Sequence, residues 1–215
     1  MNATEIAGQL ESHAAQPEQA EFTRSVGALV RRLAEGLPIA PSEAATLLGW
    51  RESDLDARLA LLPLRVERDD KGCIVGAGLT LRPTRHQFVI DGKRLYTWCA
   101  LDGLIFPILL GRTAYVTSPC VSTGRMVSVT VSPEGILAAD PPEAVLSVVP
   151  PERNSTDIRE SFCVHVNFFA STEAARTWSA ERKDAAVLSL QEAFGLANNM
   201  AQSFGKPGSC GQQTC

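Results

Sequence analysis

The sequence predicts an α+β fold, in which an N-terminal winged-helix-like three-helix module packs on a mixed, largely antiparallel sheet domain with flanking helices. Two observations lead to this class. The first third of the chain carries apolar residues at helical spacing in three short runs, followed by a hairpin signal. The rest carries short extended runs separated by Pro, Gly and Ser turns, with two further helical runs near its end.

Residues 1–20 are polar and weakly patterned, so we expect an N-terminal arm or a loose helix there. The winged-helix-like module is expected over 21–77. Its elements are a helix over 22–33 ended near Gly36, a helix over 42–48 closed by Gly49, a helix capped by Ser53 that stops at Pro63, and a hairpin with Asp69–Gly72 as its turn. Three helices followed by a hairpin are the outline of a winged helix.

An α+β domain is expected over 78–204, followed by a flexible tail over 205–215 that contains two cysteines. Its expected strands cover 78–82, 87–90, 114–117, 126–131, 144–149 and 161–169, and its expected helices cover 97–110, 172–183 and 191–203. The pair Asp91-Gly92 is a strong turn signal between two extended runs. This order of elements predicts a sheet flanked by helices.

The charge of the chain argues against a nucleic-acid binder. Its formal net charge is -4, whereas a protein that holds phosphates presents a basic face. The third helix of the module would be the recognition helix, and the charged residues around it are Arg51, Glu52, Asp54, Asp56 and Arg58. Acids outnumber bases there, so we interpret the module as a structural unit packed on the rest of the chain rather than as a DNA reader.

The start of the chain lacks the basic and apolar runs of a signal peptide, and the apolar stretch at 104–110 is too short to span a membrane. We therefore expect a cytoplasmic protein. In that reducing compartment its six cysteines would be free thiols, and none of them form a CxxC pair. The cysteines are Cys73, Cys99, Cys120, Cys163, Cys210 and Cys215.

The segment from Leu95 to Gly103 places a thiol and a carboxyl group close together in the sequence. Thr97 is predicted to cap a helix, which would put Cys99 in its first turn, where the helix dipole lowers the pKa of a thiol. Asp102 follows three residues later and would project from the same face. In the alternative interpretation Cys99 is a buried apolar residue and Asp102 a solvated acid, and this segment alone favours neither.

A second cysteine lies in the alternating segment Ser161–Phe169. The even positions of this segment are all apolar, which predicts a strand with that face buried. Cys163 would then share the polar face with His165 and Asn167, a position that indicates chemistry rather than packing. His165 would either tune the proton affinity of Cys163 or be structural, and we favour the structural role.

Seven short runs of the sequence together carry a resemblance to a known protein family. They are RLYTWCALD at 94–102, FP at 106–107, GRTA at 111–114, SFCVHV at 161–166, GLTLR at 78–82, VTVSP at 129–133 and EAFGL at 192–196. In these runs, and in their order from about residue 25 to 200, the chain resembles the organomercurial lyases (alkylmercury lyases). The resemblance implies a winged-helix-like part followed by a mixed α+β domain, with Cys99, Cys163 and Asp102 as catalytic residues that bind mercury.

These residue types suit the chemistry that the resemblance implies. Mercury(II) is soft and prefers thiolate sulfur to oxygen or nitrogen. One thiolate would bind opposite the carbon of an alkyl or aryl mercury cation, and a second would push electron density onto that carbon. Asp102 would then deliver a proton drawn from one of the thiols. The hydrocarbon would leave, and Hg(II) would stay bound by Cys99 and Cys163.

The resemblance also implies that no organic cofactor is needed, and that free thiols or a mercuric reductase accept the Hg(II). With its small size it suggests a monomer, without a nucleic-acid or membrane partner. Two alternatives are a mercury- or thiol-responsive winged-helix regulator and a zinc- or copper-binding thiol protein without catalysis. Neither explains Asp102 beside Cys99 as directly as protonolysis does.

The remaining cysteines have less definite roles. Cys120 has a counterpart in the family, and we interpret it as structural. Cys73 follows a hairpin turn and is expected to be incidental. Some family members carry a second cysteine directly after the strand cysteine; here that residue is Val164, on the predicted core face.

Cys210 and Cys215 form a Cys-x4-Cys pair in the Gly- and Gln-rich tail. They would act as a mobile dithiol that collects Hg(II), since tethering gives such a pair an effective concentration on the order of millimolar. The alternative is a tail without a function, and the sequence leaves the choice open.

Overall fold

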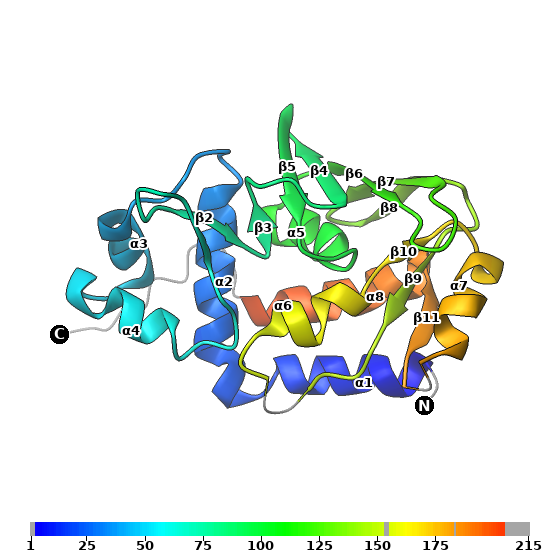
Figure 1. The fold of residues 1–215 in the computed structure, drawn as a ribbon, viewed down its shortest axis with the longest axis horizontal. Coiled ribbons are helices and arrows are strands. Elements are labelled where there is room, and N and C mark those ends of the chain that lie inside the picture. Colours follow the sequence, from blue (N-terminus) through cyan, green and yellow to red (C-terminus); the bar gives the residue numbers. More distant parts are fainter. Residues whose placement is uncertain (1–2, 153–154, 183, 205–215) are drawn as a thin grey trace.

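The structure is a computed structural model that describes residues 3–152, 155–182 and 184–204. Figure 1 shows helices arranged around two antiparallel sheets. The spatial order of the larger sheet is β1 (Glu67–Arg68), β2 (Ile74–Ala77), β3 (Leu79–Thr80), β5 (Lys93–Thr97), β4 (His86–Ile90), β6 (Ala114–Pro119), β7 (Met126–Ser132) and β8 (Gly135–Asp140). The smaller sheet contains β10 (Phe168–Phe169), β9 (Val145–Val148) and β11 (Ala186–Ser189). The α+β class is confirmed.

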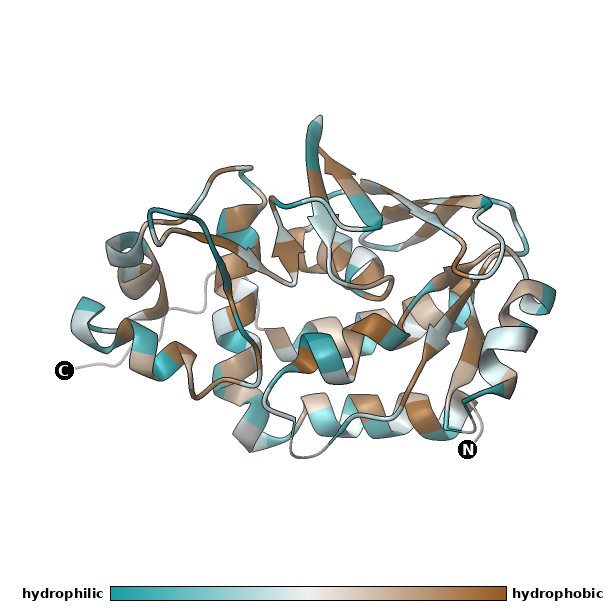
Figure 2. Cartoon of the chain, viewed as in Figure 1, coloured by the Kyte–Doolittle hydropathy of each residue, from teal (hydrophilic) through white to brown (hydrophobic). Residues whose placement is uncertain are grey.

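The helices are α1 (Ala3–Ala14), α2 (Ala20–Leu33), α3 (Pro41–Leu48), α4 (Leu55–Leu59), α5 (Asp102–Leu110), α6 (Ile158–Ser161), α7 (Thr172–Ala180) and α8 (Leu190–Ala201). In the described ranges, none of these combines the length and the apolar character that crossing a membrane requires. The strongly apolar α5 lies between the large sheet and α8 (Figures 1 and 2). It approaches β6 so closely that a Cβ on Gly103 would meet Val116 Cγ1 at 3.1 Å.

The N-terminal part contains the three predicted helices, α2 to α4, followed by the β1–β2 hairpin. The predicted turn is confirmed: Gly72 has a φ of +79°, and the Asp69 carboxylate accepts hydrogen bonds from the backbone N–H of Lys71 and Cys73, both at 2.9 Å. The predicted cap of the third helix is wrong, because the Ser53 side chain donates to Asp54 Oδ1 instead of capping α4.

The hairpin also continues into the large sheet. Strand β2 pairs with β3, and β3 pairs with β5, the strand that precedes the turn at Cys99. The boundary expected between residues 77 and 78 therefore falls inside one sheet. The N-terminal helix α1 has Ile6 and Leu10 buried, and it packs against α8. The elements around the site are thus built from both ends of the chain.

The predicted strand over 161–169 is wrong. Helix α6 ends at Ser161, residues Cys163–His165 form a 3₁₀ turn, and only Phe168 and Phe169 are extended. Phe162 and Val166 are both buried, and a spacing of four residues suits one face of a helix as well as one face of a strand. The structure departs from the alternation at Val164, which is 54% exposed rather than in the core.

Candidate functional site

Two turns bring the three predicted site residues together. Cys99 lies in the turn between β5 and α5, Asp102 opens α5, and Cys163 lies in the 3₁₀ turn after α6. Their two sulfur atoms and a carboxylate oxygen all lie within 4.8 Å of one another. Cys99 and Cys163 are buried and Asp102 is partly buried. Two thiols and a carboxyl group therefore converge on one point.

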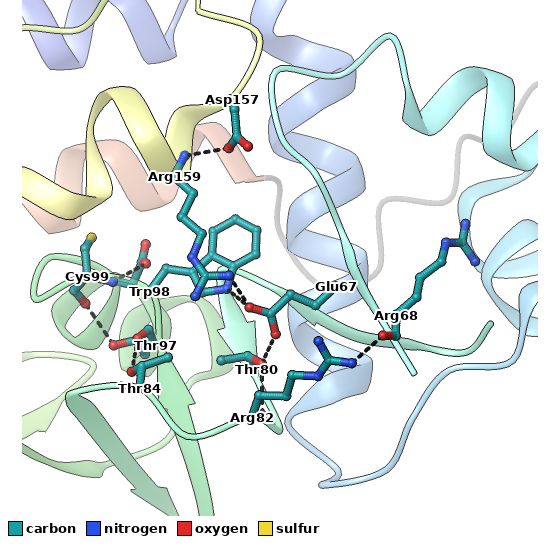
Figure 3. A network of polar contacts seen from close by, with 11 residues as sticks. Glu67, Arg68, Thr80, Arg82, Thr84, Thr97, Trp98, Cys99, Asp157 and Arg159 are labelled. Carbon is teal, nitrogen blue, oxygen red and sulfur yellow. Dashed lines mark hydrogen bonds and ion pairs between the residues drawn. The ribbon is translucent and has the colours of Figure 1, made fainter. Parts of the chain in front are cut away.

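Asp102 organises the turn that carries Cys99. Because α5 begins at Asp102, Cys99 precedes the helix, and the prediction of a helix cap at Thr97 is wrong. Thr97 is the last residue of β5 and pairs with Leu79, which keeps its backbone extended. Its hydroxyl donates to the Cys99 carbonyl at 2.8 Å, and the Cys99 N–H donates to Asp102 Oδ2 at 3.1 Å. Figure 3 shows this turn and the polar cluster beside it.

One backbone hydrogen bond joins the turn that carries Cys163 to the Cys99 turn, and a side chain of β9 supports the Cys163 turn. The Ala100 N–H donates to the Val166 carbonyl at 3.1 Å. The Ser147 hydroxyl donates to the His165 carbonyl at 2.8 Å, so His165 supports the turn through its backbone. The separation of the two thiols is therefore set by contacts between segments that are distant in the sequence.

Burial is the largest influence on the pKa values of Cys99 and Asp102. It raises the pKa of the Cys99 thiol well above its usual value, and the Cys163 hydrogen bond and the Asp102 charge add to this effect. The hydrogen bond with Cys99 lowers the pKa of Cys163, but burial and the Asp102 charge outweigh it and leave that pKa raised. Burial raises the pKa of Asp102 to about 6. The prediction that a helix dipole lowers the pKa of Cys99 is wrong, because desolvation acts in the opposite direction.

The two turns form part of the wall of a cavity of about 130 Å³. Asp102 and Cys163 line this cavity, whereas Cys99 is not among its lining residues and is more deeply buried. Most of the remaining wall is apolar and comes from α1, α2, α5, α6, α8 and the turn after it. Its apolar members include Leu10, Phe22, Val26, Leu64, Leu101, Ile105, Phe106, Phe162, Met200 and Phe204.

The raised pKa of Asp102 leads to a prediction about the stability of the protein. The pKa of Asp102 is raised in the folded protein, so its ionisation disfavours the folded state as pH rises from about 4 to 7. As pH rises from 4 to 7, we expect the unfolding free energy of Asp102→Asn to increase by about 1 to 3 kcal/mol relative to that of the native protein. Urea unfolding of both proteins at pH 4 and pH 7 measures the difference. Asp70→Asn, at an exposed carboxyl group, is the control; an equal change in both variants would contradict the assignment.

The other cysteines lie apart from this site. Cys120 is 2% exposed; burial raises its pKa, but hydrogen bonds from Thr123, Ser122 and the Ala170 backbone outweigh burial and lower it. The structural role that we expect for Cys120 stays a prediction. Cys73 is half-buried in the β1–β2 hairpin. The predicted dithiol of Cys210 and Cys215 lies outside the described residues.

Sequence reasoning missed Trp98, Arg159 and Glu67, which form the polar cluster beside the Cys99 turn (Figure 3). Arg159 lies over the Trp98 ring at 5.0 Å from its centroid, and Trp98 lines the cavity. The position of Trp98 directly before Cys99 was the one signal for it. Nothing in the local sequence links Glu67 to either residue.

Two buried thiols and a carboxyl group lie together, with Cys163 and Asp102 on the wall of a largely apolar cavity, and thiols are the ligands that a soft metal ion prefers. The family model described as alkylmercury lyase (MerB) matches residues 79–202, more than half of the chain. The chain also shares 44% identity over 184 residues with an alkylmercury lyase from Pseudomonas putida, covering 86% of each chain. The protein belongs to the alkylmercury lyase family.

Further relatives cover the remaining parts of the chain. An alkylmercury lyase from Staphylococcus epidermidis is 37% identical over 214 residues, which is 100% of this chain and 98% of the relative. The crystal structure of the mercury-bound form of MerB2 has the same fold, with a TM-score of 0.74 at 23% identity. That likeness covers 94% of this chain and 100% of the other. The family assignment thus extends over the N-terminal helices as well as the sheets.

Proposed function

We propose that this alkylmercury lyase breaks carbon–mercury bonds by protonolysis at Cys99, Cys163 and Asp102. One observation carries the proposal: the two sulfur atoms and a carboxylate oxygen lie within 4.8 Å of one another beside an apolar cavity. Two soft ligands for mercury and one proton-carrying group are the parts that the reaction needs. The mercury is part of the substrate.

The geometry suggests an order of steps. Cys163 lines the cavity, so its thiol meets the organomercurial first, displaces the ligand that the mercury carries, and releases its proton with that ligand. Cys99 lies deeper and hydrogen-bonds to Asp102, so its proton passes to the Asp102 carboxylate as its sulfur binds the mercury. Asp102 then protonates the carbon, the carbon–mercury bond breaks, and Hg(II) remains on the two sulfur atoms.

The cavity indicates the class of organic group that the enzyme accepts. Its volume of about 130 Å³ is close to that of an engineered apolar cavity of about 150 Å³ that binds benzene. Its walls are mostly aromatic and aliphatic, and the ionisable side chains among the lining residues, besides the Cys163 thiol, are His13, Asp102 and Glu152. We therefore infer that short alkyl groups and a single phenyl ring fit as the carbon ligand of mercury.

The proposal extends to the cofactor requirement, the acceptor of Hg(II), the oligomeric state and the N-terminal module. The chemistry needs no organic cofactor, because thiols and a carboxyl group supply every ligand and proton. Small thiols or a mercuric reductase withdraw the Hg(II), and the enzyme works as a monomer in the cytoplasm. The three helices and hairpin of the N-terminal part act as a winged-helix-like structural module.

The alternative of a winged-helix regulator is less well supported by the surface charges. Around α4, the bases that a phosphate backbone would contact form ion pairs with neighbouring acids. These pairs are Arg51 with Asp54, Arg58 with Glu21, and Arg68 with Asp56. A regulator would retard DNA in a gel, whereas a lyase would not.

Hydrocarbon release tests the proposed function. Phenylmercury is incubated with the native protein and an excess of a small thiol, and benzene is followed by gas chromatography. We expect catalytic formation of benzene, with many turnovers per protein molecule. Tight retention of mercury without benzene would show a capture site instead, and would favour the non-catalytic alternatives.

A further inference from the structure

Glu67, on the short strand β1, makes a set of buried contacts that the proposed reaction does not explain. Its side chain is 10% exposed. Glu67 Oε1 accepts a hydrogen bond from Trp98 Nε1 at 3.1 Å and another from the Arg159 guanidinium, and Glu67 Oε2 accepts one from the Thr80 hydroxyl at 2.5 Å. Both carboxylate oxygens are therefore occupied by donors from other segments (Figure 3).

The backbone opposite Glu67 leaves room for this arrangement. Gly76 is its register partner on β2, and a Cβ added to Gly76 would lie 2.5 Å from Glu67 Oε2 and 2.8 Å from the Thr80 hydroxyl. Any larger residue at this position would push the carboxylate away from its donors. The hairpin thus presents Glu67 to the sheet rather than to solvent.

The donors belong to the segments that carry the two site cysteines. Trp98 directly precedes Cys99, and the backbone N–H of Trp98 donates a hydrogen bond to the Gly78 carbonyl at 2.9 Å. Arg159 lies in α6, four residues before Cys163. A single carboxylate therefore contacts both segments from outside the catalytic group.

We propose that Glu67 is a positioning residue, which sets the relative placement of Cys99 and Cys163 through Trp98 and Arg159. The inference rests on the proposed function and deepens it. Glu67 touches no reacting atom; it holds the Arg159 guanidinium over the Trp98 ring and thereby orders one wall of the cavity. Both sulfur atoms must bind one mercury atom while Asp102 protonates the carbon, so a small displacement of either segment slows the chemical step.

The negative charge is the part of Glu67 that a test can remove selectively. In Glu67→Gln the amide oxygen keeps the shape and still accepts a hydrogen bond from Trp98. The variant loses the ionic partner of Arg159, and charged hydrogen bonds are roughly twice as strong as neutral ones. The matched control is Glu35→Gln: Glu35 pairs with Lys93 at 3.2 Å, at the far end of β5, and its side chain is 51% exposed.

We measure kcat and KM for benzene release, together with the number of Hg(II) ions bound per chain and the urea midpoint. For Glu67→Gln we expect kcat to fall by about 10- to 100-fold, with KM changed by less than about threefold and Hg(II) stoichiometry equal to that of the native enzyme. Glu35→Gln is expected to match the native enzyme. Thr80→Val removes one hydrogen bond to Glu67 and is expected to lower kcat by about three- to tenfold, which tests the inference if Glu67→Gln does not fold.

Three other outcomes would overturn the inference. The first is a native kcat, within twofold, in every folded variant of Glu67 and Thr80. The second is a loss of kcat that matches an equal loss of Hg(II)-binding sites, because the variant would then only reduce the amount of folded enzyme. The third is the absence of benzene from the native enzyme, which would overturn the proposed function as well and is thereby distinguished from the first two.

Discussion

Replacement of either site cysteine by serine is expected to abolish hydrocarbon release, with a loss of roughly 10³-fold or more in turnover. A hydroxyl group is a hard and weakly acidic ligand, and mercury prefers thiolate sulfur. In Cys163→Ser the substrate loses the sulfur that lines the cavity. In Cys99→Ser the second sulfur is missing, which in the proposed mechanism pushes electron density onto the carbon. Each variant therefore lacks a different part of the same step.

Benzene release and mercury retention measure these two variants. Cys73→Ser is the matched control, because Cys73 is a partly buried thiol in the β1–β2 hairpin, away from the cavity. We expect the control to match the native enzyme. Cys163→Ser or Cys99→Ser with more than a tenth of the native turnover would contradict the assignment of the two thiols.

Asp102→Asn has the second largest expected effect, a loss of about 10²- to 10⁴-fold in kcat. The amide has the same shape as the carboxylate, and its oxygen can still accept the Cys99 N–H that Asp102 accepts at 3.1 Å. It cannot take up the thiol proton and return it to carbon. The turn at Cys99 should therefore keep its conformation while the proton transfer fails.

Mercury binding separates this variant from the cysteine variants. Both sulfur atoms remain in Asp102→Asn, so we expect Hg(II) to bind with the stoichiometry of the native enzyme, whereas the serine variants lose a ligand. Equilibrium dialysis against Hg(II) with a competing thiol measures this. A kcat within tenfold of the native value would mean that a thiol protonates the carbon directly and that Asp102 has another role.

Much of the fold follows from local patterns. Helix α2, the turn at Asp69 and the turn at Asp91 were predictable, because helical spacing, an Asx-type turn and a left-handed glycine each depend on a few neighbouring residues. Asp91 and Gly92 have φ values of +48° and +73°. The edge strand β8 was missed, because exposed Leu137 breaks the alternation that marks a buried strand face.

The errors around the site share one cause. The segment 161–169 alternates like a strand, and the segment 97–102 has a threonine placed like a helix cap. Both contain the start or end of an element, and local propensity does not decide where such an element stops. Pairing of Thr97 within the sheet, and packing of Phe162 and Val166 in the core, decided the two turns.

The sequence by itself determined which groups are available, namely two thiols and a carboxyl group of the kinds that mercury chemistry needs, and the family to which the chain belongs. Only the tertiary structure decided that these groups converge within 4.8 Å, that burial rather than a helix dipole governs their protonation, and that Glu67 contacts both cysteine-bearing segments. The physical reason is that residue type and local periodicity belong to short segments. Desolvation and long-range hydrogen bonds exist only after distant segments have packed together.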